Sequence, residues 1–361
     1  MGLKIRRAFE VGRVARRGSL LRVLGEVGVV GNKPATREGA RAFRLGIEEL
    51  GTTYVKLGQL LSSRPDLLPD VYIDELGKLV DDVPPFSFAE ARRIIDEDIG
   101  LDAFARLEEE PLACASIAQV HGALLRTGRE VVVKVRRPGI EEQVALDLEL
   151  LGSLTTFAEG HSETARLVQM EALANELEAH LAAELDFVEE AHGSELIAKL
   201  VAEHEHLLVP EVIHPYVTER VLVQERIVGE KVTERHGVDG ERARQLAREL
   251  FRAYVQQITA HGVYHADPHR GNILLTPDGR LALLDFGLLG RLDDDTRRAF
   301  DASRVGTGFA GLYYDCNTGA GLRRSASENF IRDERFAGPQ GGRIVARITR
   351  QPSELFFVGS N

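Results

Sequence analysis

The sequence predicts an α+β fold with a two-lobed body and an added segment. Its 361 residues exceed one typical domain, so more than one compact part is expected. Short β-branched runs at 120–125 and 131–135 predict strands, whereas the apolar spacing over 241–261 predicts an amphipathic helix. In the stretch 265–287, two further apolar runs flank a turn.

This last stretch reads HADPHRGNILLTPDGRLALLDFG and carries three polar residues at a distinctive spacing. Asn272 follows Asp267 by five residues, and Asp285 opens an Asp-Phe-Gly triplet. Kinases place a catalytic aspartate, and an asparagine and second aspartate that hold Mg²⁺, at the same spacing. A hairpin turning at 277–279 would bring both aspartates to one rim. We expect a site for ATP or ADP with Mg²⁺, although an aspartate before a glycine is usually only a turn.

Composition narrows the class of protein. The chain is 43% hydrophobic and 28% charged, which is typical of a globular protein, and its net charge of −11 argues against a nucleic-acid partner. Cys114 and Cys316 form neither a disulfide framework nor a metal-ligand cluster, which favours a reducing cytosol. No run approaches 18 apolar residues and no signal peptide is evident. We expect a cytoplasmic protein without a transmembrane helix.

Residues 1–34 form a basic leader with interleaved apolar residues. Such a segment can lie on an anionic membrane surface. A solvated leader is the alternative, and the contrast with the acidic remainder of the chain favours peripheral contact at the inner face of the membrane.

Helical spacing predicts a helix over 37–61, a short helix over 71–80, and a third over 88–98 with Ser87 as its N-cap. Lys56 and Gln59 lie three residues apart on the first helix and therefore share a face. From spacing alone, a solvated polar face is the preferred interpretation.

Lys134 lies inside the predicted strand 131–135. A lysine near a strand end is usually an edge charge. Between valines, and upstream of the aspartate pair, Lys134 fits better as the ammonium that meets nucleotide phosphates. The preceding loop, 113–116, stands where a kinase carries a glycine-rich phosphate cover. Because alanine keeps its Cβ, we expect the nucleotide to lie differently than in a protein kinase.

Two long helices are predicted over 140–159 and 164–202, followed by strands 209–213 and 220–227 with a turn at His214-Pro215. The second helix carries four acidic candidates for the helix carboxylate that pairs with the strand lysine in kinases. These are Glu184, Asp186, Glu189 and Glu190. Acids this dense usually mark a solvated face, and periodicity does not choose among them.

Six motifs then occur in a fixed order. They are K-L-G-Q at 56–59, PLACASIAQVH at 111–121, VVVKV at 131–135, ELDFVEEA at 184–191, HADPHRGN at 265–272 and LLDFG at 283–287. Together they resemble the UbiB/AarF atypical kinase-like family, which is associated with quinone biosynthesis, over about residues 35–300. The resemblance implies a bilobal protein-kinase-like fold with an N-terminal helical KxGQ extension.

The resemblance also implies a domain plan. A basic leader (1–34) would precede the helical KxGQ extension (35–106), a small lobe with inserted helices (107–228) and a large lobe (229–300). The Gly/Ser/Arg-rich remainder (301–361) lacks the helices expected there, so the large lobe would be truncated, by nature or by a reading-frame error.

Roles follow from the same resemblance. Asp267 would be the catalytic aspartate, and Lys134 would pair with Glu190, with Glu189 as second choice. Lys56 and Gln59 would project into the ATP site and contact Glu184 and Asp186. Asn272 and Asp285 would bind the metal. The cover over the phosphates would be Ala113, Cys114, Ala115 and Ser116, and the backbone of Glu225, Arg226 and Ile227 would read adenine.

The implied function is an Mg²⁺-dependent phosphotransferase or ATPase that supports isoprenoid-quinone synthesis or lipid handling, with an isoprenoid lipid or quinone precursor as partner. Protein phosphorylation fits less well, because His269 stands where protein kinases commonly carry lysine. The alternatives are a small-molecule phosphotransferase of the aminoglycoside-kinase type and a non-catalytic, nucleotide-gated lipid or membrane scaffold.

Overall fold

The computed structural model describes residues 2–17, 34–62, 64, 67–79, 83–161, 170–232, 240–266 and 270–293, and two strands within the last 60 residues. It divides the chain into two compact units. Unit 1 comprises Met1–Val188 and His214–Val223, and unit 2 comprises Glu189–Ile213 and Gln224–Asn361. The α+β architecture predicted from the sequence is confirmed. Among the helices in these ranges, none is long and apolar enough to cross a membrane.

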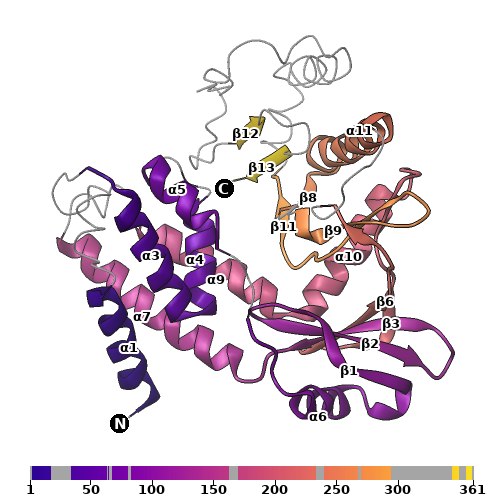
Figure 1. Ribbon diagram of the computed structural model, residues 1–361, viewed down its shortest axis with the longest axis horizontal. Helices are drawn as coiled ribbons and strands as arrows, with labels where there is room; N and C mark the ends of the chain where they lie inside the picture. The colour runs from indigo at the N-terminus through magenta and orange to yellow at the C-terminus, as the bar shows by residue number, and fades with distance from the viewer. Residues whose placement is uncertain are drawn as a thin grey trace. The chain divides into compact units, whose positions relative to one another are not determined.

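Helices build one part of unit 1 (Figure 1). They are α1 (Leu3–Arg17), α3 (Arg37–Leu50), α4 (Thr52–Ser62), α5 (Asp70–Leu76), α7 (Ile140–His161) and α9 (Met170–Leu185). Helices α7 and α9 pack against each other, and α4 contacts both. The shared core contains Val14, Ile47, Tyr54, Val55 and Leu76, all buried. Apolar residues at helical spacing therefore face one common interior, as their pattern predicts.

The prediction of a single helix over 37–61 is wrong, because the helix is interrupted at Gly51. This glycine has a φ of +87° and its N–H donates to the Ile47 and Glu48 carbonyls, so it ends α3 and turns the chain into α4. Glycine adopts such a positive φ readily because it has no Cβ. The short helix α5 ends at Leu76, earlier than predicted.

Helix α6 (Phe88–Asp98) confirms the predicted helix and its cap. The Ser87 hydroxyl accepts the Glu90 N–H, and the Glu90 carboxylate accepts the Ser87 N–H, which completes a capping box. The helix lies against the sheet of unit 1 (Figure 1).

That sheet has the order β1-β2-β3-β6-β5. Its strands are β1 (Phe104–Cys114), β2 (Ala118–Leu125), β3 (Glu130–Arg136), β5 (Val212–Val217) and β6 (Val221–Glu225). Strands β1, β2 and β3 pair antiparallel in sequence order. A short 3-10 turn, Leu101–Ala103, precedes β1. Val131, Val133 and Val135 alternate along β3 and are fully buried, which explains why this run of valines forms a strand.

Two further expectations are wrong in this region. His214 and Pro215 lie within β5, joined by a cis peptide, and the chain turns at 218–220 instead. The Thr218 side chain stabilises that turn by accepting the Arg220 and Val221 N–H groups. The predicted helix over 164–202 is interrupted at Asp186, whose carboxylate accepts the Val188 N–H and so caps α10 (Phe187–Val201).

Unit 2 contains α10 from Glu189 onward, α11 (Gly240–Gln256), the π-helical turn Gln257–His261, and a sheet of order β4-β10-β9-β7. Its strands are β4 (Leu207–Leu208), β7 (Glu230–Lys231), β9 (Ile273–Leu275) and β10 (Leu281–Leu283). Strand β8 (Val263–His265) pairs antiparallel with β11 (Leu289–Arg291), and β12 (Ile344–Ile348) with β13 (Leu355–Gly359). The predicted hairpin is confirmed, with β9 and β10 antiparallel and Gly279 at a φ of +83° in its turn.

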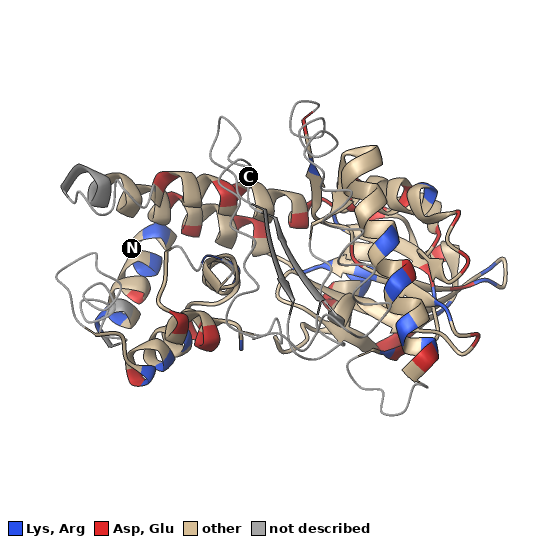
Figure 2. Ribbon diagram, turned by 90° about the horizontal axis from the view of Figure 1, so that it is seen from above, with Lys and Arg blue, Asp and Glu red and all other residues tan. Residues whose placement is uncertain are grey.

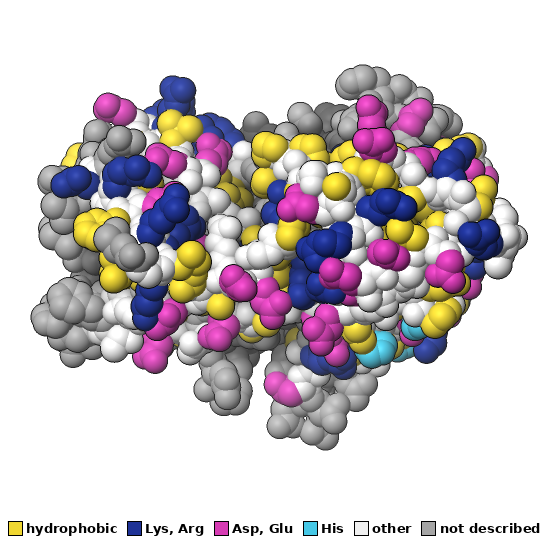
Figure 3. All heavy atoms as spheres, turned by 90° about the horizontal axis from the view of Figure 1, so that it is seen from below, with side chains coloured by type: hydrophobic (Ala, Val, Ile, Leu, Met, Phe, Trp, Pro, Cys, Tyr) yellow, Lys and Arg dark blue, Asp and Glu magenta, His cyan; other side chains and the backbone are white. Residues whose placement is uncertain are grey.

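The core of unit 2 joins α10 and α11 to this hairpin. Ile197, Leu246, Leu275, Leu283 and Phe286 are among its buried members. Basic and acidic residues occur on both units (Figure 2), and on the face in Figure 3 they are interspersed with hydrophobic side chains. The residue boundaries of the predicted domain plan remain predictions, and most of the tail after residue 300 lies outside the described residues.

Candidate functional site

Strand β3 presents Lys134 from the middle of the unit 1 sheet. Its neighbours Val133 and Val135 are fully buried, and its ammonium lies 5.1 Å from the centre of the Phe187 ring. Phe187 is itself fully buried at the start of α10. A cation above an aromatic face is attracted by the ring, so Phe187 restricts where the lysine can reach. Phe187 belongs to the ELDFVEEA motif, but no sequence pattern indicates this role for it.

The Ala-rich segment is shorter as a loop than predicted. Ala113 and Cys114 belong to β1, where they pair with Val120 and Gln119, and the loop proper is 115–117. The Ala115 N–H donates to the Ala118 carbonyl at 2.7 Å and closes this loop tightly. Ser116 is buried, and its carbonyl accepts the Thr52 hydroxyl of α4 at 3.4 Å.

Arg137 supports the same loop, and apart from its place after β3 no pattern in the sequence marks it. Its guanidinium donates to the Ala115 carbonyl at 3.4 Å and to the Pro84 carbonyl at 3.0 Å. It also lies 5.3 Å from the centre of the Phe86 ring. Burial lowers the pKa of Arg137, and the nearby Cys114 partly offsets that effect. The segment before α6 is thereby tied to the loop.

The KxGQ motif lies on α4. Lys56 forms an ion pair with Glu184 of α9 at 2.8 Å, so the contact implied by the resemblance is present and the solvated-face interpretation of Lys56 is wrong. Gly58 is buried, and a Cβ there would come within 2.4 Å of the Leu79 side chain. The Gln59 carbonyl accepts the Ser62 hydroxyl at 2.6 Å. Glycine at 58 therefore allows α4 to pack closely. Asp186, the other acid of this implied contact, caps the N-terminus of α10.

Of the two candidate helix carboxylates in unit 2, burial distinguishes Glu190 from Glu189. Glu190 is 3% exposed, whereas the side chain of Glu189 is 68% exposed and lies 4.0 Å from His192. A buried carboxylate is costly unless a cation or hydrogen-bond donors compensate it. Glu190 is the carboxylate that the family resemblance implies as the partner of Lys134, and this pairing stays a prediction.

Asn272 and Asp285 lie at the same end of the β9–β10 hairpin. Asn272 ends the 3-10 turn Arg270–Asn272 just before β9, and its carbonyl accepts the Leu284 N–H at 2.8 Å. Asp285 follows and is exposed, with a φ of +58°. Its carboxylate accepts the Gly287 N–H at 3.4 Å. A left-handed backbone at a non-glycine residue costs free energy and clusters at functional sites.

Buried aromatic residues hold the segment around Asp285. The Phe286 ring is 2% exposed and lies 5.0 Å from the ring of His265, which stacks on Tyr254. The Gln257 side chain, 1% exposed, accepts the His265 N–H at 3.1 Å. Sequence reasoning missed Gln257. No periodic or motif signal marks it, because it acts from the π-helical turn.

The remaining predicted residues are placed as follows. Asp267 and His269 lie outside the described residues, next to Ala266, whose N–H donates to the Leu288 carbonyl at 3.0 Å. Glu225 ends β6, and Arg226 and Ile227 follow it, all half-buried.

The donor set of Asn272 and Asp285 suits Mg²⁺. The ion prefers oxygen ligands and usually takes one or two from the protein, with water and phosphate completing its shell. Within the described ranges no group of three or more His, Cys, Asp or Glu could hold a metal ion. An amide oxygen and a carboxylate at one hairpin end are what a metal bound jointly with phosphates requires.

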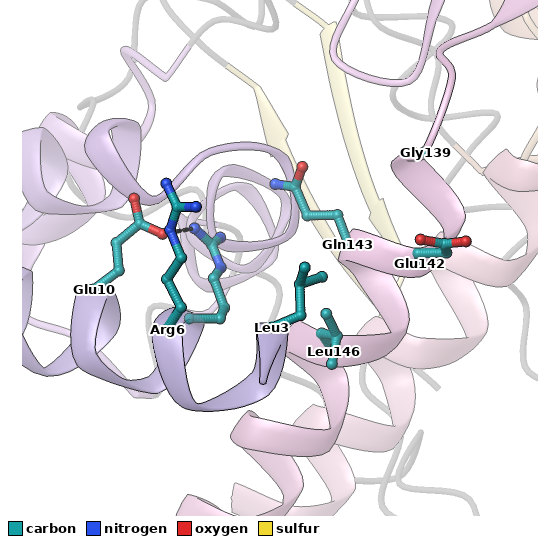
Figure 4. A pocket seen from close by; sticks show the side chains of 8 residues that line it. Leu3, Arg6, Glu10, Gly139, Glu142, Gln143 and Leu146 are labelled. Carbon is teal, nitrogen blue, oxygen red and sulfur yellow. Dashed lines mark hydrogen bonds and ion pairs between the residues drawn. The ribbon is translucent and has the colours of Figure 1, made fainter. Parts of the chain in front are cut away.

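A cavity of about 360 Å³ lies between α1 and the start of α7 (Figure 4). Leu3, Arg6 and Glu10 line it from α1, and Gln143 and Leu146 line it from α7. None of the predicted site residues lines this cavity.

The chain is similar in sequence to a known protein family and to several of its members. A model of the ABC1 atypical kinase-like domain matches residues 78–305. The chain is 39% identical over 266 residues to a probable protein kinase UbiB of Xylella fastidiosa, covering 70% of this chain and 48% of that protein. It is 37% identical over 268 residues to the Arabidopsis thaliana chloroplastic protein ACTIVITY OF BC1 COMPLEX KINASE 8, covering 72% and 35%.

A solved structure of a Mycobacterium tuberculosis protein in complex with erythromycin is also similar, with a TM-score of 0.54 and 28% identity. The match covers 86% of this chain and 75% of that one. The chain spans about half or less of the length of the two curated relatives described above.

Proposed function

Since the chain belongs to the ABC1 atypical kinase-like family, we propose that it binds Mg·ATP and acts as a phosphotransferase or ATPase. The observation that carries the proposal is the hairpin end at which Asn272 and the left-handed Asp285 lie together. A metal bound there neutralises phosphate charge. The side chains of Asn272 and Asp285 would hold it through oxygen atoms.

Unit 1 contributes the groups that would meet the nucleotide. The Lys134 ammonium, positioned above Phe187, would neutralise phosphate oxygens. The loop at 115–117 would cover the phosphates with backbone that is already tied down by Thr52 and Arg137. Asp267 would accept the proton of the attacking hydroxyl or water, as its position in the motif implies.

We propose a lipid or isoprenoid-quinone precursor as the object of this activity. The support is the family and the relative named as a probable UbiB kinase. The second candidate is a nucleotide-gated scaffold without turnover. The aminoglycoside-kinase type is disfavoured by the KxGQ helix, whose lysine is engaged with Glu184.

A measurement of phosphate release from ATP distinguishes the proposed enzyme from the non-catalytic scaffold. The parent chain should release phosphate in the presence of Mg²⁺, and Lys134→Met and Asp267→Asn should each lower the rate by at least about a hundredfold. Lys199→Met, a lysine in the last turn of α10, is the control and should retain the parent rate. If the parent binds Mg·ATP but releases no phosphate, the protein is a nucleotide-gated scaffold and not an enzyme. Equal rates of phosphate release for the parent and Lys134→Met would refute the proposed enzymatic activity.

We further propose that α1 contacts an anionic membrane surface. Its outward face exposes Ile5 and Phe9, at 50% and 69%, beside the exposed Arg6, Arg13 and Arg16. The one acid of α1, Glu10, is paired with Arg7 and so does not cancel this charge. Apolar and basic side chains together favour the headgroup region of anionic bilayers.

Co-sedimentation with vesicles tests the contact. The parent should bind phosphatidylserine-containing vesicles more strongly than neutral ones, and Phe9→Asp should reduce that binding by about tenfold, because it removes apolar burial and adds a negative charge. Leu45→Asp, an equally simple change at an exposed leucine of α3, is the matched control. Equal loss in both variants would argue against α1 as the contact.

A further inference from the structure

Arg7, on the inward face of α1, binds the corner at which α3 turns into α4. Its guanidinium donates to both carboxylate oxygens of Asp147, at 2.6 and 2.9 Å, and to the Leu50 carbonyl at 2.6 Å. It also lies 5.7 Å from the centre of the Tyr54 ring. One side chain thus touches the last residue of α3, the first turn of α4, and α7.

The groups that Arg7 contacts are buried or unsatisfied without it. Asp147 is fully buried, so its charge requires the guanidinium. Hydrogen bonding to Asp147 raises the pKa of Arg7 despite its partial burial, with Glu10 contributing further. Leu50 offers one of the carbonyls that a helix end leaves unsatisfied, and Arg7 satisfies it. Beside this contact, the cavity between α1 and the start of α7 shows that the first turn of α1 is not closely packed there (Figure 4).

The corner is in turn connected to the candidate nucleotide site. Gly51, with its φ of +87°, directly precedes α4, and the hydroxyl of the next residue, Thr52, donates to the Ser116 carbonyl within the loop at 115–117. Two residues beyond Tyr54, Lys56 pairs with Glu184. A displacement of the corner would therefore move both the loop and the KxGQ lysine, because Thr52 and Lys56 both lie on α4.

We propose that Arg7 is a positioning residue of the candidate nucleotide site. It holds the α3–α4 corner, and through α4 it sets the place of the loop at 115–117 and of Lys56. The functional consequence rests on the proposed binding of Mg·ATP, whereas the structural coupling does not. Because the outward face of α1 lies opposite Arg7 on the helix, membrane contact and this inward contact are compatible.

Hydrogen exchange in the absence of nucleotide tests the coupling. Arg7→Lys keeps a positive charge near Asp147, but a lysine lacks the planar fork that reaches Asp147 and Leu50 together. We expect amides of 52–60 and 115–118 to exchange about tenfold faster, while those of α6 are unchanged. Arg13→Lys, on the outward face of the same helix, should leave all of them unchanged. Unchanged exchange at 52–60 and 115–118 in Arg7→Lys would overturn the proposal.

A charge-free double variant separates positioning from charge balance. Arg7→Met with Asp147→Leu removes the buried carboxylate, so the melting temperature should return toward that of the parent. The corner contacts stay absent, so fast exchange at 52–60 and weakened Mg·ATP binding, by about tenfold, should persist. Parental exchange and parental nucleotide affinity in this variant would reduce Arg7 to balancing the charge of Asp147.

The two proposals fail in distinguishable ways. If the double variant does not fold, the comparison of Arg7→Lys with Arg13→Lys decides. If the parent chain binds no Mg·ATP, the proposed function fails, while the exchange comparison still decides whether Arg7 positions α4 and the loop.

Discussion

At the scale of single residues, buried polar side chains with specific partners connect the segments of unit 1. His121 is fully buried on β2, and its Nδ1 lies 2.9 Å from the Glu108 carbonyl. Its Nε2 lies 2.8 Å from the Gln119 amide, which also bonds the Phe86 backbone. These partners suit a neutral imidazole that donates from Nδ1 and accepts at Nε2.

The stability of the protein should therefore fall as the pH falls below 6.5. Burial lowers the pKa of His121 from its usual 6.5, although the bond to the Glu108 carbonyl opposes that effect. Below pH 6.5 the unfolded chain binds a proton that the folded chain does not, so unfolding is favoured. Urea unfolding at pH 7.5 and 5.5 should show this loss for the parent and a smaller loss for His121→Gln.

His192→Gln is the control for this experiment, because His192 is exposed on α10. It should retain the pH dependence of the parent. Equal pH dependence of the stability of His121→Gln and His192→Gln would show that His121 does not cause the loss.

At the scale of elements, helix ends and close approaches determine the local structure. Ser87→Ala should destabilise the protein by about 1 kcal/mol, because it removes the capping-box bond at the start of α6. The denaturant midpoint should fall with an unchanged slope. Ser153→Ala, within the exposed face of α7, is the matched control and should change the midpoint little. Equal effects of the two changes would contradict the cap.

At Gly193, α10 closely approaches the Asp-Phe-Gly segment. A Cβ at this position would lie 2.8 Å from the Phe286 carbonyl oxygen. Gly193→Ala should therefore destabilise the protein by about 1–3 kcal/mol despite the better helix propensity of alanine.

Gly152→Ala provides the contrast, because nothing lies within 4 Å of a Cβ there. It should stabilise α7 by up to about 1 kcal/mol. Both variants are compared by urea unfolding, and stabilisation by Gly193→Ala would show that α10 does not approach Phe286 so closely.

Elements with a strong period were predictable from the sequence. Helix α6, the valine strand β3 and the β9–β10 hairpin all occur where expected, because buried faces and turn residues leave a local pattern. The breaks at Gly51 and Asp186 were not predicted. Apolar residues continue at helical spacing across both, and only the backbone conformation at the break reveals it.

Some parts of the candidate site were likewise predictable from the sequence, and others were not. Motif spacing predicted the hairpin end with Asn272 and Asp285, and the family resemblance implied the pairing of Lys56 with Glu184. Neither motif spacing nor the resemblance identified the residues that support the candidate site, which are Phe187, Arg137 and Gln257. Their roles come from tertiary contacts between segments distant in the chain, and such contacts have no periodic signature.

At the scale of the whole molecule, each unit has its own core and its own candidate residues. Lys134, Lys56 and the Ala-rich loop belong to unit 1, and Asn272 and Asp285 to unit 2. The chain matches the ABC1 domain over residues 78–305, and the curated relatives are longer. We propose that the candidate residues of both units serve one function, the binding of ATP with Mg²⁺.

Calorimetric titration with ATP, in Mg²⁺ and in EDTA, tests that claim most directly. The parent should bind ATP at least about tenfold more tightly with Mg²⁺, and Asp285→Asn should abolish that difference by removing a metal-binding charge. Asparagine tolerates the left-handed backbone at this position, so the melting temperature without nucleotide should not change. ATP binding of equal strength in Mg²⁺ and EDTA, or unaltered Mg²⁺ dependence in Asp285→Asn, would contradict the account.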